Sequence, residues 1–116
     1  KVVLRSDTMF SELQINEKIS FFLEIENQYN FKLKRDHNEL PLQVKFTLAE
    51  GKRIIHEGNV DVDLPDVLEA GKSIQLNASF KIPDIEAGHY ILRLSLKSGV
   101  LPSGFNSQNF HTELKI

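Results

Sequence analysis

Hydrophobic and polar residues alternate along most of this chain with a period of two. A period of two places successive side chains on opposite faces of a β-strand, so each alternating segment predicts a strand with one buried and one wet face. No segment shows the 3.6-residue period of an amphipathic helix. The alternating segments are residues 2–5, 19–25, 42–48, 74–80, 90–96 and 110–116.

The middle of the chain is less regular but continues the same pattern. Residues 50–52 predict a tight turn, and residues 53–57 predict the strand that follows it. Gly58 and Asn59 are expected to break this strand, after which the alternation resumes over residues 60–64. Residues 65–71 predict a loop with room for one helical turn.

Seven to eight short strands joined by turns predict an all-β fold, an immunoglobulin-like antiparallel β-sandwich. Residues 1–116 have the length of one domain with one core. Because the chain opens on Lys1, we expect this domain to be excised from a larger protein.

One local motif supports the sandwich. Gly88 precedes Tyr90 by two residues at the start of a strongly alternating strand. This is the layout of a tyrosine corner, in which the tyrosine hydroxyl bonds to the backbone a few residues upstream while the ring enters the core. We therefore expect Tyr90 to be buried and hydrogen-bonded.

Three connections are expected to meet at one end of the sandwich: residues 27–40, 65–71 and 98–108. The first and last are long for links of this kind, and long loops on a rigid sandwich often carry recognition. Both combine aromatic rings, which stack on sugar faces, with amides and charged groups, which bond sugar hydroxyls. The candidate stacking residues are Tyr29, Phe31 and Phe105, and the candidate polar contacts are Asn30, Arg35, His37 and Asn106. Alternatively, the aromatics close the end of the core and the polar groups cap turns.

Charge and composition exclude several classes of function. The 14 basic and 16 acidic residues give a net charge of −2, which provides no electrostatic basis for binding nucleic acid. No apolar run approaches the roughly 20 residues of a membrane span. With no cysteine, disulfides and thiolate metal sites are excluded, and the compartment stays open between cytoplasm, periplasm and cell surface.

The sequence predicts no catalytic residue, metal site or cofactor. The four histidines lack metal-ligand spacing, and no Gly-x-Ser-x-Gly elbow is present. Asp61, Asp63 and Asp66 could in principle hold calcium, but calcium needs six or more oxygens, so we interpret them as solvated strand residues.

Four segments spread along the chain belong to one recurring plan of turns that lead into strands. They are Asn16-Glu17-Lys18, Ala49-Glu50-Gly51-Lys52, Glu69-Ala70-Gly71-Lys72-Ser73 and Glu86-Ala87-Gly88-His89-Tyr90-Ile91-Leu92. This plan resembles a family of immunoglobulin-like accessory domains in bacterial polysaccharide-handling proteins, and it is similar to the C-terminal glycan-recognition domain of O-antigen export ATPases. The resemblance spans nearly the whole chain, although no ligand contact of that family matches a position here.

The expected function is that of a non-catalytic module that recognises a glycan or positions a polysaccharide-active partner domain of the parent chain. The absence of tryptophan departs from the commonest sugar-stacking residue. Phe22 occupies a polar-face position of its strand and suggests the alternative of a protein-interaction or adhesion module. A structural spacer without a ligand is the third possibility.

Overall fold

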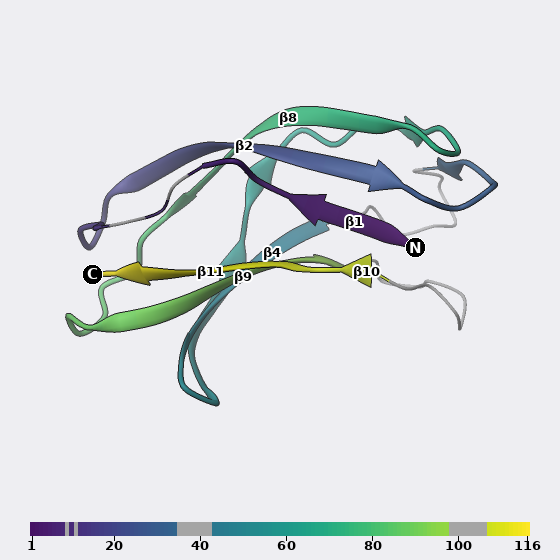
Figure 1. Ribbon diagram of the computed structural model, residues 1–116. Helices are drawn as coiled ribbons and strands as arrows, with labels where there is room; N and C mark the ends of the chain where they lie inside the picture. Colours follow the sequence, from purple (N-terminus) through teal and green to yellow (C-terminus); the bar gives the residue numbers. More distant parts are fainter. Residues whose placement is uncertain (9, 11, 35–42, 98–106) are drawn as a thin grey trace.

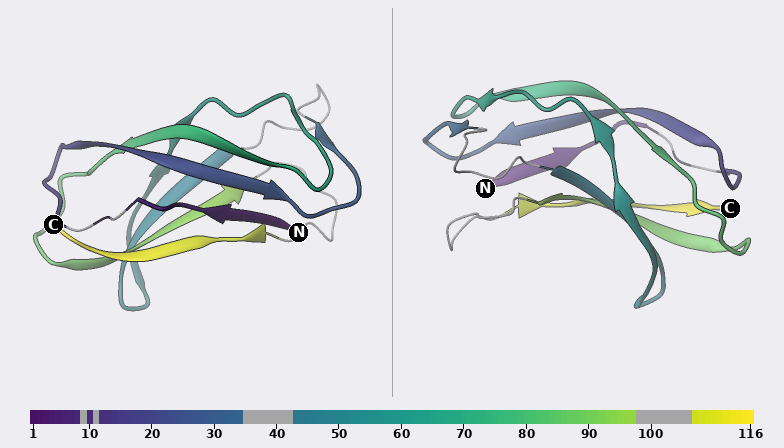
Figure 2. Two further views of the ribbon diagram at one scale, coloured as in Figure 1. Left: turned by 45° about the horizontal axis from the view of Figure 1, so that its top comes forward. Right: turned by 180° about the vertical axis from the view of Figure 1, so that it is seen from behind.

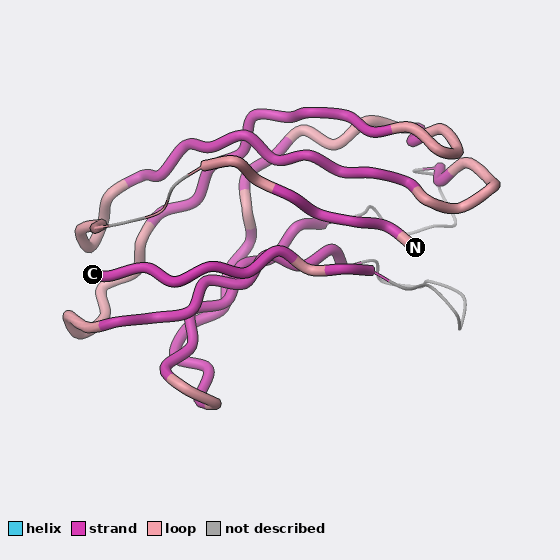
Figure 3. The backbone as a smooth tube through the Cα atoms, in the orientation of Figure 1, coloured by secondary structure: helices cyan, strands magenta, loops and turns pink. Residues whose placement is uncertain are grey.

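The computed structural model describes residues 1–8, 10, 12–34, 43–97 and 107–116, which form strands, turns and loops without a helix (Figure 3). The strands alternate buried and exposed side chains, as the sequence pattern predicts. They are β1 (Val2–Arg5), β2 (Lys18–Asn27), β3 (Leu33–Lys34), β4 (Gln43–Glu50), β5 (Arg53–Asn59), β6 (Asp61–Val62), β7 (Val67–Leu68), β8 (Ser73–Lys81), β9 (His89–Lys97), β10 (Ser107–Gln108) and β11 (Phe110–Lys115).

Two sheets face each other and form the sandwich (Figure 1). Sheet A has the order β10-β1-β2-β8-β6, and sheet B has the order β11-β9-β4-β5. The short β3 and β7 form a third, two-stranded pair. The molecule is elongated, 43 × 25 × 21 Å, with its two termini at opposite ends (Figures 1 and 2). The predicted immunoglobulin-like β-sandwich is therefore confirmed.

At two places the chain passes from one sheet to the other over a single residue. Asn59 ends β5 in sheet B, and Asp61 begins β6 in sheet A, with the buried Val60 between them. The last stretch of chain crosses in the same way, from β10 in sheet A to β11 in sheet B. The sequence predicts an antiparallel sandwich, but β10 runs parallel to β1, so this pair of strands departs from the prediction.

An aromatic stack joins the two sheets across the core. Phe46 of sheet B lies face to face with Phe80 of sheet A, with ring centroids 4.4 Å apart. Phe21 packs edge-on against Phe80, at 5.8 Å, and Phe10 packs edge-on against Phe21, at 5.4 Å. Offset or edge-on aromatic pairs add to the free energy gained by burying their area.

Two sequence expectations in the middle of the chain are wrong. Gly58 does not break its strand: it pairs with Phe46 inside β5, where a Cβ atom would come within 2.6 Å of the Phe46 ring. The loop after Pro65 contains no helical turn, because Val67 and Leu68 form β7 and pair with β3. Both depend on contacts with distant segments, which local patterns do not report.

The tyrosine corner is confirmed. The Tyr90 ring is buried in the core, 4% exposed, and its hydroxyl donates a hydrogen bond to the backbone carbonyl of Glu86. Gly88 exchanges two backbone hydrogen bonds with Ile116, of 3.0 and 2.9 Å. The corner therefore ties the start of β9 to the end of the chain.

Replacing Gly58 with alanine tests the packing of Phe46. The new methyl group would press on a core ring, so we expect Gly58→Ala to lower the free energy of unfolding by about 1–3 kcal/mol. Gly88→Ala is the matched control, because its Cβ would meet the Tyr90 ring at an ordinary 3.8 Å. Equal stability of the two variants in chemical denaturation would contradict the packing described here.

Replacing Tyr90 with phenylalanine tests the corner. We expect Tyr90→Phe to cost about 1–2 kcal/mol, because the Glu86 carbonyl loses its donor. Burial, and then the nearby carboxylates of Glu50 and Glu86, raise the pKa of Tyr90. Its contribution is therefore complete below the unfolded pKa of about 10 and is lost as pH rises through the folded pKa. We expect the free energy of unfolding, measured by denaturation at a series of alkaline pH values, to fall less steeply with pH for Tyr90→Phe than for the wild-type domain. Parallel pH profiles of the two proteins would argue against the buried hydrogen bond of Tyr90.

Candidate functional site

A buried asparagine organises the end of the sandwich where β2 finishes, and we name this end, with the turn after β2 and the segment containing β7, the loop end. Asn27 is fully buried, and its side-chain amide donates to the backbone carbonyls of Phe31 and Leu68, each at 3.0 Å. Its side-chain oxygen accepts from the Tyr29 N–H at 2.9 Å. Its backbone also exchanges hydrogen bonds with Gly71 and Lys72. One residue thus connects the turn after β2 with the segment containing β7, and these two connections meet at one end as predicted.

The turn that Asn27 holds carries two stacked aromatic rings. Tyr29 and Phe31 have ring centroids 4.7 Å apart and an interplanar angle of 25°. Tyr29 is half-buried and packs against the core. For this residue the structure therefore supports the alternative given by the sequence analysis, that the loop aromatics close the end of the core. Phe31 is 53% exposed, and Asn30 between the two is also exposed. The turn therefore presents an aromatic surface supported from beneath.

Three of the seven residues predicted from the sequence are thereby brought together: Tyr29, Asn30 and Phe31. Arg35, His37, Phe105 and Asn106 lie outside the residues that the structure describes. Their proposed contacts stay predictions.

The outer face of sheet A forms a second candidate site, which the sequence analysis did not identify as a ligand site. Along β8, Ser73, Gln75, Asn77 and Ser79 point outward, while the residues between them point toward the core. They pair with the outward residues of β2, among them Phe22, which lies opposite Asn77 and is 58% exposed. The sequence predicted this exposure of Phe22, and the structure confirms it.

A depression of about 620 Å³ lies on this face beside Phe22, and we name it the Phe22 depression. It extends from β2 across β8 to β6. The hydroxyl of Ser6 donates to the Phe22 carbonyl at 2.7 Å and accepts from the Thr8 N–H at 3.2 Å, which brings Thr8 to its rim. Its other polar and aromatic lining residues are Ser20, Phe21, Phe22, Asp61, Asp63, Asn77 and Ser79.

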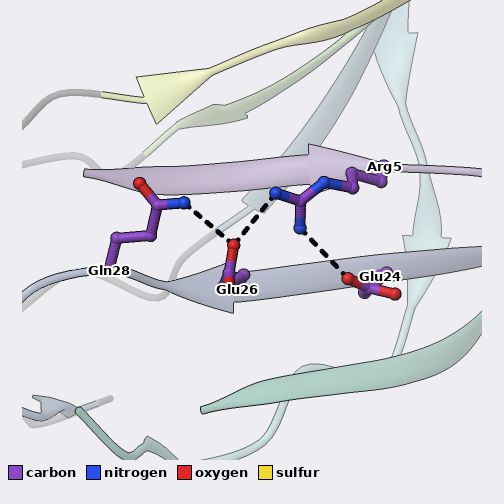
Figure 4. Close-up of polar contacts among 4 residues, drawn as sticks. All are labelled: Arg5, Glu24, Glu26 and Gln28. Atoms are coloured by element: carbon purple, nitrogen blue, oxygen red, sulfur yellow. Dashed lines mark hydrogen bonds and ion pairs between the residues drawn. The ribbon is translucent and has the colours of Figure 1, made fainter. Parts of the chain in front are cut away.

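A charge network lies on the same face, toward the other end of β2 (Figure 4). The Arg5 guanidinium contacts Glu24 at 3.1 Å and Glu26 at 3.0 Å. A hydrogen bond from Gln28, together with Arg5, lowers the pKa of Glu26, and Glu26 in turn raises the pKa of Arg5. Arg5 is thus matched by two carboxylates, and at the other end of the two strands Lys18 of β2 pairs with Lys81 of β8.

A metal-binding cluster and a membrane-spanning helix are both absent from the described residues. Those residues include no group of three or more histidine, cysteine or acidic residues placed to hold a metal ion. In the same part of the chain, no helix is long and apolar enough to cross a membrane.

Comparison with known proteins establishes the fold alone. No family model and no curated protein matches the sequence. The chain is similar in structure to part of the alkylpurine DNA glycosylase AlkC of Pseudomonas fluorescens, solved bound to DNA containing an abasic site analogue. The TM-score is 0.54 at 12% identity, and the match covers 99% of this chain but only 30% of the glycosylase chain. A PapD-like domain of human CEP192 matches with a TM-score of 0.42 at 15% identity, covering 99% of this chain and 82% of that one.

Two substitutions at Asn27 test whether it holds the loop end. Asn27→Ala leaves two carbonyls and one N–H without their partner, so we expect a loss of about 1–3 kcal/mol in the free energy of unfolding. We expect Asn27→Asp, which keeps the shape, to be at least as harmful, because a carboxylate oxygen would face the carbonyls of Phe31 and Leu68. The exposed Asn30→Ala is the control and should change little. A wild-type unfolding midpoint for Asn27→Asp would refute this role.

Proposed function

We propose that this domain is a non-catalytic module that recognises carbohydrate, or that positions a polysaccharide-active partner domain. The observation that carries the proposal is the ring of Phe31, which is exposed while stacked on Tyr29 in a turn held by Asn27. A sugar ring has an apolar C–H face and a rim of hydroxyls, so a fixed aromatic ring beside polar groups suits it.

Fixing the ring before binding supports affinity. A ligand that stacks on a mobile side chain must also order that side chain, which costs about 0.5–1.5 kcal/mol. Phe31 already has a neighbour on one side, and its own carbonyl is bonded to Asn27. The entropic cost of stacking a sugar on its open side is correspondingly small.

The charge balance argues against a nucleic-acid ligand. Binding to a phosphate backbone relies on clustered lysine and arginine side chains. The chain has a net charge of −2, and on the outer face of sheet A the guanidinium of Arg5 is already paired with Glu24 and Glu26. The similarity to part of a DNA glycosylase therefore enters this proposal only as a similarity of fold.

The alternative function is a protein-interaction or adhesion module, and the exposure of Phe22 favours it. Such a module would self-associate or bind a protein through the outer face of sheet A. Sedimentation of the purified domain distinguishes the two, because self-association that disappears in Phe22→Ser supports the alternative.

The test of carbohydrate recognition is a glycan array probed with the wild-type domain and with Phe31→Ala. We expect the variant to lose roughly tenfold or more in affinity, as is common when a central aromatic contact is truncated. Ile54→Ala is the matched control, because Ile54 is similarly exposed, at 57% against 53% for Phe31, but lies on β5 of sheet B. Absence of any glycan binding by the wild-type domain would refute the proposed function.

A further inference from the structure

We infer that the Phe22 depression on the outer face of sheet A is a binding site for an uncharged oligosaccharide. It is separate from the loop end, and it rests on the proposed function only in taking carbohydrate as the ligand. The inference draws on four properties of the depression: its size, the arrangement of its walls, its hydrogen-bonding groups and its charge.

The size and the walls suit a sugar ring. Its volume of about 620 Å³ falls within the usual range of small-molecule sites, roughly 300–1,000 Å³. Phe22 lies on β2 and Asp61 on β6, with β8 between them. Two strand spacings separate these walls, roughly 10 Å. We expect a pyranose ring to lie between them above β8, with its apolar face toward Phe22.

The hydrogen-bonding groups are matched to hydroxyls. Strand pairing places Ser20, Ser79 and Asp61 in one row across the three strands. Asn77 lies opposite Phe22 in the next row. Hydroxyl and amide groups both donate and accept, while carboxylates only accept. A ligand whose own groups also do both, such as a sugar, can satisfy all of them at once.

The charge of the depression selects against anionic sugars. Asp61 and Asp63 are both exposed on its β6 side. Its lining residues include no lysine or arginine, and the nearest cations of β2 and β8 are Lys18 and Lys81, which pair with each other in the row beyond Ser20. A uronic acid or phosphorylated sugar would bring a like charge close to these carboxylates, which is unfavourable. We therefore assign the site to neutral hexose units and expect acidic polysaccharides to be excluded.

The backbone around Phe22 is already fixed. On one side Phe22 pairs with Asn77 of β8, and on the other its carbonyl accepts the Ser6 hydroxyl. The aromatic wall therefore stands on ordered sheet rather than on a loop, which is the firmer support for a binding site.

The experiment uses the intact 116-residue domain labelled with ¹⁵N and short neutral gluco-, manno- and galacto-oligosaccharides, with oligouronates as the charged comparison. We expect a neutral oligosaccharide to shift amide signals of β2, β6 and β8. Phe22→Ser should weaken this binding about tenfold or more, whereas Phe22→Trp should retain it. Ile54→Ser is the control for loss of an exposed apolar side chain. Phe22→Ser should fold normally, since surface substitutions usually change stability by less than about 0.5 kcal/mol.

A second variant tests the charge selection. Asp61→Asn with Asp63→Asn should admit oligouronates that the wild-type domain rejects, while binding of neutral oligosaccharides persists. Shifts confined to the loop end, with unchanged affinity in Phe22→Ser, would overturn this inference and leave the proposed function standing. If no glycan shifts any signal, both fail. Self-association lost in Phe22→Ser, without glycan binding, would assign this face to a protein partner instead.

Discussion

The stack of Phe46 on Phe80 is the interaction on which the rest of the structure depends, because it fixes both sheets in register at once. Side chains alternate strictly along a strand, so a slip of one residue would exchange the two faces of a sheet. With Phe80 and Phe21 held in the core, their neighbours Ser79 and Phe22 must face outward. The composition of the outer face of sheet A is thus a consequence of how the core packs.

The crossing of the chain between sheets completes that face. Asn59 is still paired with Lys45 in sheet B, yet two residues later Asp61 is paired with Ser79 in sheet A. The buried Val60 anchors the crossing, and its N–H bonds to the carbonyl of Val44. Without this crossing β8 would be an edge strand along its whole length. The carboxylates that form the far wall of the Phe22 depression would also lie elsewhere.

The sequence predicted those features that depend on local pattern. Alternation identified the main strands, and the spacing of Gly88 and Tyr90 identified the corner. It did not reveal the roles of Asn27 and Gly58, because each depends on residues distant in the chain: Leu68 for the amide and Phe46 for the glycine. The Phe22 depression is invisible for the same reason, since its walls come from strands about 40 residues apart in sequence. The loop end was partly predictable, because Tyr29 and Phe31 are neighbours along one turn.

The two most exposed apolar side chains of the described residues, Phe22 and Ile54, lie in different surroundings. Ile54 is as exposed as Phe22, but it lies on the edge strand β5, near the tip of a hairpin that projects away from the sandwich in Figure 1. That strand carries a register shift opposite Leu48 and Ala49 and has Arg53 and Glu57 along it. Bulges and charges of this kind protect sheet edges from pairing with another chain. Phe22 instead lies on β2, which pairs with β8 without a register shift, although the pairing of β2 with β1 ends at Glu24. Since no bulge or charged neighbour of this kind accompanies Phe22 in its row of β2 and β8, its exposure beside a hollow of polar groups is the feature from which we infer a ligand.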